Sequence, residues 1–247
     1  MAYDGIITYG ITKELLSKIK LGKIDKIYQP GPEDIIIQVH TRGGNLKLLA
    51  SCNSMSARLC LTTNKYDNPT APPNFCMLLR KHLQGGRITD VRQPDSDRIV
   101  EIDVEAMTEM GFTTSRRLIF EVMGKHSNII LTDIESGKIL DACKRVSIDV
   151  NRYRQTLPGT VYKYPPSQDK LPFKGITKNN VLGNSTKGIL AKVSGISPAI
   201  AREISTAKNP AERLDEIVST IDTLTFRPRI YSDGNSPIEF HLTDLSE

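Results

Sequence analysis

The segment DRIVEIDVEA, residues 97–106, alternates between apolar and charged side chains. Val100 and Ile102 occupy one set of alternating positions, and acidic residues stand between them. Successive side chains of a β-strand point to opposite faces of a sheet, so this pattern predicts a strand with one buried and one solvated face. We therefore expect Glu101 and Asp103 to lie on the solvated face, and we assign this carboxylate pair no catalytic role.

Short apolar runs of the same kind lie on both sides of this segment. They cover residues 23–29, 34–41, 45–52, 57–62, 87–93, 116–123, 127–133 and 138–147. Turn residues such as Pro-Gly-Pro and Gly-Gly-Asn separate several of them, which favours antiparallel hairpins over a parallel sheet. The fold class predicted for residues 1–170 is therefore α+β, with a β-sandwich-like domain of two packed sheets and flanking helices.

Two helices are expected within this domain. The first is predicted over residues 12–20, with Thr12 as its cap. The second lies within residues 72–86, where Phe75 and Leu79 share an apolar face and a Gly-Gly pair ends the helix.

The chain changes character after the tract YKYPPSQDKLPF, residues 162–173, whose prolines and polar residues indicate a connection. Helical patterns follow, over residues 177–183, 187–193, 198–206 and 209–223. We assign residues 171–226 to a small helical domain. Residues 227–247 begin a further segment, in which Asp-Gly-Asn predicts a hairpin.

Composition limits the chemistry that we expect. The 247 residues carry a net charge of +5, which weakly favours an anionic partner. The four cysteines form no C-x-x-C pair and the four histidines are scattered, so we predict free thiols, no metal and no cofactor. No apolar run reaches membrane-spanning length and the N-terminus is not a signal peptide, so we expect a cytoplasmic protein without a membrane partner.

The segment EVMGKHSNIILTD, residues 121–133, superficially resembles a phosphate-binding loop. Such a loop requires a glycine five positions before Gly124, a Ser or Thr after Lys125, and a helix afterwards. The chain instead has Ile119, His126 and a predicted strand, so we reject nucleotide hydrolysis. We expect a hairpin turn in which Gly124 adopts a positive φ.

The segment LAKVSGISPAIAREI, residues 190–204, resembles a helix-hairpin-helix motif. In that motif the hairpin, here Gly195, Ile196 and Ser197, presents backbone N–H groups to a nucleic-acid phosphate. An ordinary helix pair with Gly195 as its turn residue explains the same pattern.

Arg98 shares the parity of Val100 and Ile102, so we expect it at the rim of the apolar face of the sheet. An arginine in that position needs a partner, and Asp95 or Asp97 is near in sequence. One interpretation is a structural ion pair. The other is a guanidinium that binds a phosphate or a base edge.

Four stretches together go beyond this local reasoning. They are MAYDGI at 1–6, PPNFCMLLRKHLQGGRI at 72–88, the region from DRIVEI to EVMGKHSNIILTD at 97–133, and KRVSIDVNRYRQTLPGTVY at 144–162. They resemble the N-terminal part of the NFACT/RqcH family of ribosome quality-control factors, also known as fibronectin-binding protein A-like.

This resemblance implies an NFACT-N domain similar to the N-terminal β-sandwich of formamidopyrimidine-DNA glycosylases, followed by a helix-hairpin-helix domain. Family members continue into a coiled coil. No heptad run occurs here, so we expect the chain to be truncated before it.

The resemblance also implies a function. Family members bind the large ribosomal subunit that is obstructed by a peptidyl-tRNA, and they recruit charged tRNA, alanyl-tRNA in bacteria, for C-terminal alanine tailing of the stalled chain. The ribosome forms the peptide bonds, so we expect no enzyme activity. The predicted RNA-binding residues are Asp4, Asp97, Arg98, Glu121, Val122, Met123, Lys125, His126, Asn128, Arg80 and Lys81, with Arg87 and Arg92 extending the basic surface.

Two other functions are considered. The name of the family suggests a surface adhesin that binds fibronectin, against which the absence of a signal peptide and of disulfides argues. The fold resemblance suggests a DNA-glycosylase-like nucleic-acid-binding protein, but the N-terminal proline of those enzymes is missing.

Overall fold

The structure is a computed structural model that describes residues 3–108, 110–166 and 168–245. The chain divides into two compact units. The smaller unit comprises Met1–Gly10, Gln93–Arg98 and Pro166–Glu247, and the larger one comprises Ile11–Arg92 and Ile99–Pro165. The sequence-based division at residues 170 and 226 differs from this one, since it assigns the first ten residues and the 93–98 loop to the β domain.

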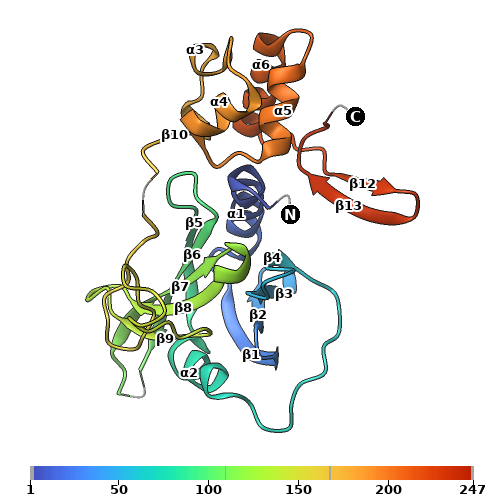
Figure 1. Cartoon of the computed structure of the whole chain (residues 1–247). Helices are drawn as coiled ribbons and strands as arrows, with labels where there is room; N and C mark the ends of the chain where they lie inside the picture. The colour runs from blue at the N-terminus through green and yellow to red at the C-terminus, as the bar shows by residue number, and fades with distance from the viewer. Residues whose placement is uncertain (1–2, 109, 167, 246–247) are drawn as a thin grey trace. The chain divides into compact units, whose positions relative to one another are not determined.

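The larger unit is built on one nine-stranded sheet with the strand order β4-β3-β2-β1-β5-β6-β7-β8-β9, and neighbouring strands are antiparallel (Figure 1). Its strands are β1 (Lys23–Gly31), β2 (Asp34–Thr41), β3 (Gly44–Ser51), β4 (Arg58–Leu61), β5 (Arg87–Arg92), β6 (Ile99–Met107), β7 (Thr113–Glu121), β8 (Asn128–Asp133) and β9 (Ile139–Ala142). The antiparallel hairpins predicted from the turn residues are therefore confirmed.

The expectation of two separate sheets is wrong in this respect. β1 and β5 form a ladder at the single pair Lys23–Arg87, and this pair joins the first four strands to the last five. The sheet also curves back on itself, because the Nζ of Lys144, just after β9, lies 2.6 Å from the carbonyl oxygen of Cys52, just after β3. The two layers are thus two halves of one sheet.

Two helices occur along the chain among these strands: α1 (Gly5–Ile19) comes before β1, and α2 (Asn74–Leu83) lies between β4 and β5. α2 follows Pro73 and buries Phe75 and Leu79, as predicted. α1 begins well before the predicted start near residue 12. The reason is that Asp4 caps it by accepting a 3.0 Å hydrogen bond from the N–H of Ile7, whereas Thr12 is buried within the helix.

The smaller unit contains four short helices, a parallel pair of two-residue strands and a hairpin in its described residues (Figure 1). They are α3 (Lys178–Val181), α4 (Thr186–Lys192), α5 (Pro198–Thr206), α6 (Pro210–Thr223), β10 (Leu171–Pro172), β11 (Val193–Ser194), β12 (Arg229–Asp233) and β13 (Ser236–His241). The predicted helices and the Asp-Gly-Asn hairpin are confirmed. Buried residues such as Ile6, Phe173, Ile200 and Leu214 form one apolar core. Over the described residues, no helix is both long and apolar enough to span a bilayer.

Candidate nucleic-acid interface

Asp4 is buried in the smaller unit, with 6% of its surface exposed. One carboxylate oxygen caps α1, and the other accepts a 3.0 Å hydrogen bond from the backbone N–H of Ser197. A carboxylate that is buried and accepts several hydrogen bonds is committed to the fold. The predicted contact of Asp4 with RNA is therefore corrected, because this side chain holds the N-terminus of α1 to the connection before α5.

His241 completes this cluster and is fully buried. The N–H of Thr243 donates to its Nδ1 at 3.2 Å, so Nδ1 is an acceptor and Nε2 carries the proton in the neutral ring. Nε2 lies 3.3 Å from the second carboxylate oxygen of Asp4 and donates to it. Sequence reasoning missed this residue because its partner stands 237 positions away.

The connection between α4 and α5 is packed and not open. The carbonyl of Gly195 accepts a 2.8 Å hydrogen bond from the N–H of Gly5, and the N–H of Ser197 donates a hydrogen bond to the carboxylate of Asp4. Gly195 has φ +80°, and a Cβ placed there would lie 2.4 Å from the carbonyl oxygen of Ser96. Ile196 packs on the apolar core. The predicted phosphate contact of Ser197 is corrected, because its N–H already has a partner within the unit, whereas the predicted contacts of the Gly195 and Ile196 N–H groups stay predictions.

The loop 93–98, between β5 and β6, is fixed by Gln93. Its Nε2 donates to the carbonyl oxygens of Gly5 at 2.9 Å and of Asp97 at 2.7 Å. Asp97 is half-buried, and its Oδ1 accepts a 2.7 Å hydrogen bond from the backbone N–H of Arg98. The conformation of this loop is therefore set by hydrogen bonds within the smaller unit.

Arg98 is exposed and precedes β6, which begins at Ile99. The predicted position at the rim of the apolar face is therefore wrong. No ion pair or side-chain hydrogen bond of its guanidinium occurs in the described parts of the chain, so the structural ion pair with Asp95 or Asp97 is also not formed. The loop presents a free guanidinium, which can bind a phosphate by two parallel hydrogen bonds.

In the larger unit, residues 122–127 connect β7 to β8 as the predicted hairpin turn. Gly124 has φ +57°, as expected, and begins a short 3-10 turn. Inside the turn, the Oγ of Ser127 accepts a 2.8 Å hydrogen bond from the N–H of Met123. Lys125 and His126 are exposed at its tip. The structure therefore keeps these two residues as candidates for contact with an external anion.

The other predicted residues of this turn face inward. Val122 is buried, and Met123 packs on the apolar cluster around Ile119 and Ile130. The predicted RNA contact of the Val122 side chain is corrected, because that side chain is buried, whereas Met123 is half-buried and its contact stays a prediction.

Glu121 is buried, with 1% of its surface exposed, and its carboxylate pairs with Arg154. It also accepts a 2.7 Å hydrogen bond from the hydroxyl of Tyr162. Burial, together with the neighbouring negative charge of Glu121, raises the pKa of Tyr162 well above its ordinary value. Glu121 thus ties the end of β7 to the segment after β9, which removes it from the predicted RNA surface.

Asn128 uses its whole amide group within the fold. Its Oδ1 accepts hydrogen bonds from the N–H groups of Ile129 and Lys144, both at 2.9 Å, and its Nδ2 donates to the carbonyl of Lys144 at 2.7 Å. The residue is 3% exposed. Of the two roles considered, reading a base edge or holding the turn, the structure supports the structural one.

The basic residues of α2 and β5 divide in the same way. The Nε of Arg80 donates to the carbonyl of Ile27 at 2.7 Å, and its guanidinium lies 5.7 Å from the ring centroid of Tyr28. Arg92 is committed to three carboxylates. Lys81 and Arg87 are exposed. Arg80 and Arg92 are therefore structural, and only Lys81 and Arg87 can extend a basic surface.

Glu101 and Asp103 of β6 do not lie on the solvated face that the alternation predicts. Glu101 is 1% exposed and pairs with Arg92 and Arg117, and it accepts a hydrogen bond from the hydroxyl of Tyr164. Asp103 bonds the same two arginines at 2.7 and 2.8 Å. Burial alone would raise the pKa of Asp103, but its hydrogen bonds to Arg117 and Arg92 outweigh burial and hold that pKa below its ordinary value.

The exposed candidates are therefore four cations and one imidazole, and no carboxylate, hydroxyl or thiol is among them. They are Arg98 in the smaller unit and Lys81, Arg87, Lys125 and the imidazole of His126 in the larger unit. Among the described residues, no group of three His, Cys, Asp or Glu side chains is arranged to hold a metal. These side chains can bind anions and stack on bases.

Comparison with known proteins gives a consistent assignment. The family described as "NFACT N-terminal and middle domains" matches residues 4–247. The Rqc2 homolog RqcH of Bacillus subtilis (strain 168) is 43% identical over 210 residues, which cover 82% of this chain and 37% of that protein. The chain therefore spans about a third of the length of this curated relative.

Two solved structures share the fold. The fibrinogen binding protein from Staphylococcus aureus has a TM-score of 0.86 and 33% identity, with 99% of this chain and 91% of that one covered. The N-terminal part of the fibronectin/fibrinogen-binding protein from Streptococcus suis has a TM-score of 0.88 and 31% identity, with 98% and 91% covered. By its family match and by these relatives, the chain belongs to the NFACT family.

Proposed function

We propose that this chain is the tRNA- and ribosome-binding module of a cytoplasmic ribosome quality-control factor. In this role it engages a large subunit that holds a peptidyl-tRNA, and it recruits charged tRNA, alanyl-tRNA in bacteria, for tailing of the stalled chain. The module itself has no catalytic activity. The proposal is supported by the 43% sequence identity between this chain and the Bacillus subtilis RqcH, and by the chemistry of the exposed residues.

The observation that carries the proposal is the exposed, unpaired guanidinium of Arg98 on a loop fixed by Gln93. A free arginine costs side-chain entropy when it binds, but a loop held by hydrogen bonds has no further backbone entropy to lose. Such a group is suited to a phosphate or to the edge of a guanine. Lys125 adds a point charge, and His126 adds a ring that can stack on a base.

The test is tRNA binding by purified protein, with Arg98→Ala and Lys125→Ala as variants. Each substitution should weaken binding about tenfold or more, since a charged hydrogen bond contributes about 1.5 to 3 kcal/mol. Arg42→Ala and Lys208→Ala remove exposed cations outside the predicted set and are matched controls. An equal loss of tRNA affinity in all four variants would show that the effect comes from net charge alone. Unchanged affinity in Arg98→Ala and Lys125→Ala would refute the assignment of these two residues to tRNA binding.

The turn residues allow a sharper comparison. Lys125→Ala should weaken all tRNAs about equally, because a lysine contacts phosphate without reading sequence. His126→Ala should also change the order of preference among tRNAs if its ring stacks on a base. Binding measured over a panel of purified tRNAs separates the two behaviours.

A second function has support from the named structural relatives, which are described as fibrinogen and fibronectin/fibrinogen-binding proteins. The same purified protein can be tested on immobilised fibronectin and fibrinogen. Saturable binding that survives Arg98→Ala would establish an adhesive surface separate from the RNA-binding residues.

A further inference from the structure

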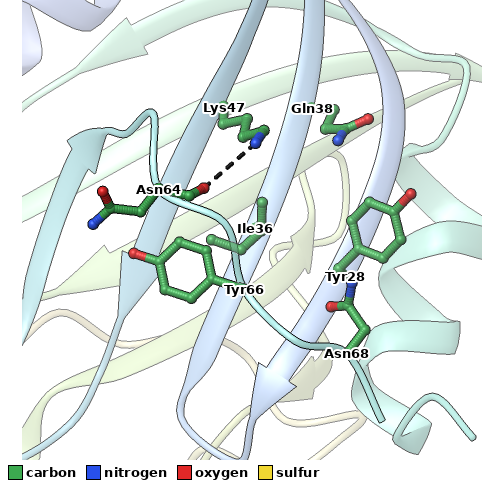
Figure 2. Close-up of a pocket in the computed structure, with 7 residues that line it drawn as sticks. All are labelled: Tyr28, Ile36, Gln38, Lys47, Asn64, Tyr66 and Asn68. Carbon is green, nitrogen blue, oxygen red and sulfur yellow. Dashed lines mark hydrogen bonds between the residues drawn. The ribbon is translucent and has the colours of Figure 1, made fainter. Parts of the chain in front are cut away.

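The first three strands of the sheet place polar and aromatic side chains on one face. The register pairs Tyr28 on β1 with Ile36 on β2, and it pairs Gln38 on β2 with Lys47 on β3, so these four side chains share one side of the sheet. The segment after β4 then crosses this face. With it the strands line a cavity of about 140 Å³, to which the segment contributes Asn64, Tyr66 and Asn68 (Figure 2).

The lining of this cavity combines an apolar floor with unused polar groups. Ile36 is 4% exposed and lies between the rings of Tyr28 and Tyr66 in the view of Figure 2. The Nζ of Lys47 is 3.4 Å from the carbonyl oxygen of Asn64 and ties the crossing segment to β3. In the described parts of the chain, the tyrosine hydroxyls and the three side-chain amides of the cavity form no hydrogen bond.

We propose that this cavity binds a single unpaired pyrimidine base of an RNA. The inference rests on the proposed function and adds a site whose lining includes none of the predicted RNA-binding residues. Single-stranded RNA is recognised by stacking of bases on aromatic rings and by hydrogen bonds to base edges. Tyrosine rings, amide groups that can donate and accept, and a lysine for the adjacent phosphate are the components of such a site.

The size of the cavity selects the class of base. A protein cavity of about 150 Å³ accommodates one benzene ring, and this cavity has a similar volume. One six-membered ring therefore fits the volume that these residues line, whereas the two fused rings of a purine exceed it. The base must be unpaired, because a paired base is stacked between its neighbours and does not expose its faces.

Arg80 contacts the ring of Tyr28, which lines this cavity. Its guanidinium lies 5.7 Å from the centroid of the Tyr28 ring while its Nε is held by the carbonyl of Ile27. The tyrosine ring is thus fixed before a base arrives, which lowers the entropy lost on stacking. This gives a role to Arg80, the predicted arginine of α2.

The inference is tested with a labelled oligouridylate and an oligoadenylate of about eight nucleotides, a length typical of single-strand sites. We expect the oligouridylate to bind more tightly. Tyr66→Ala should weaken its binding about tenfold, and Tyr66→Phe, which keeps the ring, should weaken it less than about twofold. Tyr153→Ala removes an exposed tyrosine elsewhere and is the matched control. Circular dichroism melting curves establish that each variant is folded.

Two results would overturn the inference: equal affinity for both oligonucleotides, or oligouridylate binding that is unchanged by Tyr66→Ala. Its failure is distinguishable from failure of the proposed function. If Arg98→Ala abolishes tRNA binding but Tyr66→Ala leaves oligouridylate binding intact, the pocket assignment fails and the function stands. If tRNA does not bind to the wild-type protein but oligouridylate binding depends on Tyr66, the proposed function fails and the pocket stands.

Discussion

Asn128 shows how a polar residue can be essential to a fold without facing a ligand. Its amide forms hydrogen bonds with three backbone groups, two of which belong to Lys144. Because the residue is 3% exposed, water cannot replace these bonds without entering the core. The amide thus joins β8 to the segment that follows β9.

Asn128→Ala should therefore destabilise the protein by about 2 to 4 kcal/mol, because it leaves two N–H groups unpaired inside, whereas the carbonyl of Lys144 keeps the hydroxyl of Thr156 as a donor. Urea unfolding measures this loss. Asn179→Ala, an exposed position on α3, is the control and should change stability by less than about 0.5 kcal/mol. tRNA binding by the folded variant should equal that of the wild type. A stable Asn128→Ala protein with impaired tRNA binding would instead restore the role of reading a base edge.

Asp97 and Arg98 should behave differently from each other, although both are predicted RNA-binding residues. Asp97 accepts the N–H of Arg98 and so shapes the loop that carries the guanidinium. Asp97→Ala should weaken tRNA binding by misplacing Arg98, whereas Asp97→Asn keeps an acceptor oxygen and should recover most of the affinity. Arg98→Ala should weaken binding without lowering the melting temperature. If Asp97→Asn binds as poorly as Asp97→Ala, the carboxylate charge itself contacts the ligand and the positioning role is wrong.

Sequence patterns singled out the polar residues of these loops as binding candidates, but they did not predict which of these side chains are buried. Asp4 and Arg98 are both charged residues in family-like motifs, yet Asp4 is enclosed and Arg98 is free. The difference is set by partners far along the chain, since the carboxylate of Asp4 meets the N–H of Ser197 at a separation of 193 residues. Local patterns carry no information about such contacts, so a motif alone cannot separate a buried polar group from a binding group.

At the scale of elements, the alternation in β6 predicted the strand but misjudged one of its faces. Arg92 from β5 and Arg117 from β7 lie beside Glu101 and Asp103, and the hydroxyl of Tyr164 also reaches Glu101. An alternating pattern predicts that one face is apolar and cannot show that the polar face is covered by neighbouring strands. The face is therefore an ion-pair network that connects β5, β6 and β7.

This network gives a stability change with pH of known sign. The folded-state pKa of Asp103 lies below the ordinary value of an aspartate, so its contribution to stability is fully present above that ordinary pKa and is lost as pH falls through the lowered one. Asp103→Asn should cost about 2 kcal/mol at pH 7. The difference in unfolding free energy between wild type and variant should shrink below about pH 4.

Urea unfolding at pH 7 and at about pH 3 measures this change. Asp149→Asn, at an exposed position, provides a control with little effect at either pH. A wild-type advantage that stays constant over this range would show that Asp103 acts by packing and not by charge.

At the scale of the whole chain, the change in composition near residue 165 located a real division between the two units, but only one of the four points at which the chain crosses between them. The smaller unit also takes in Met1–Gly10 and Gln93–Arg98, which are joined to it by the bonds of Asp4 and Gln93. The composition of these two segments does not distinguish them from the chain around them, because they belong to the smaller unit through hydrogen bonds to backbone groups far along the sequence. A unit assembled from three separate stretches of chain is therefore beyond local sequence patterns.

The charge of the whole molecule, +5, leads to the last prediction. If the partner is an RNA, each phosphate that is neutralised releases counterions, and log affinity falls linearly with log salt. The affinity for tRNA should thus drop steeply between about 50 and 200 mM salt. Replacing both Arg98 and Lys125 by alanine should reduce the slope by about two, roughly one for each phosphate that is no longer neutralised. Replacing the controls Arg42 and Lys208 should lower affinity slightly through net charge but leave the slope unchanged, because neither is expected to lie against the RNA. A flat salt dependence in the wild type would indicate a partner held by uncharged groups, and it would favour a protein ligand over tRNA.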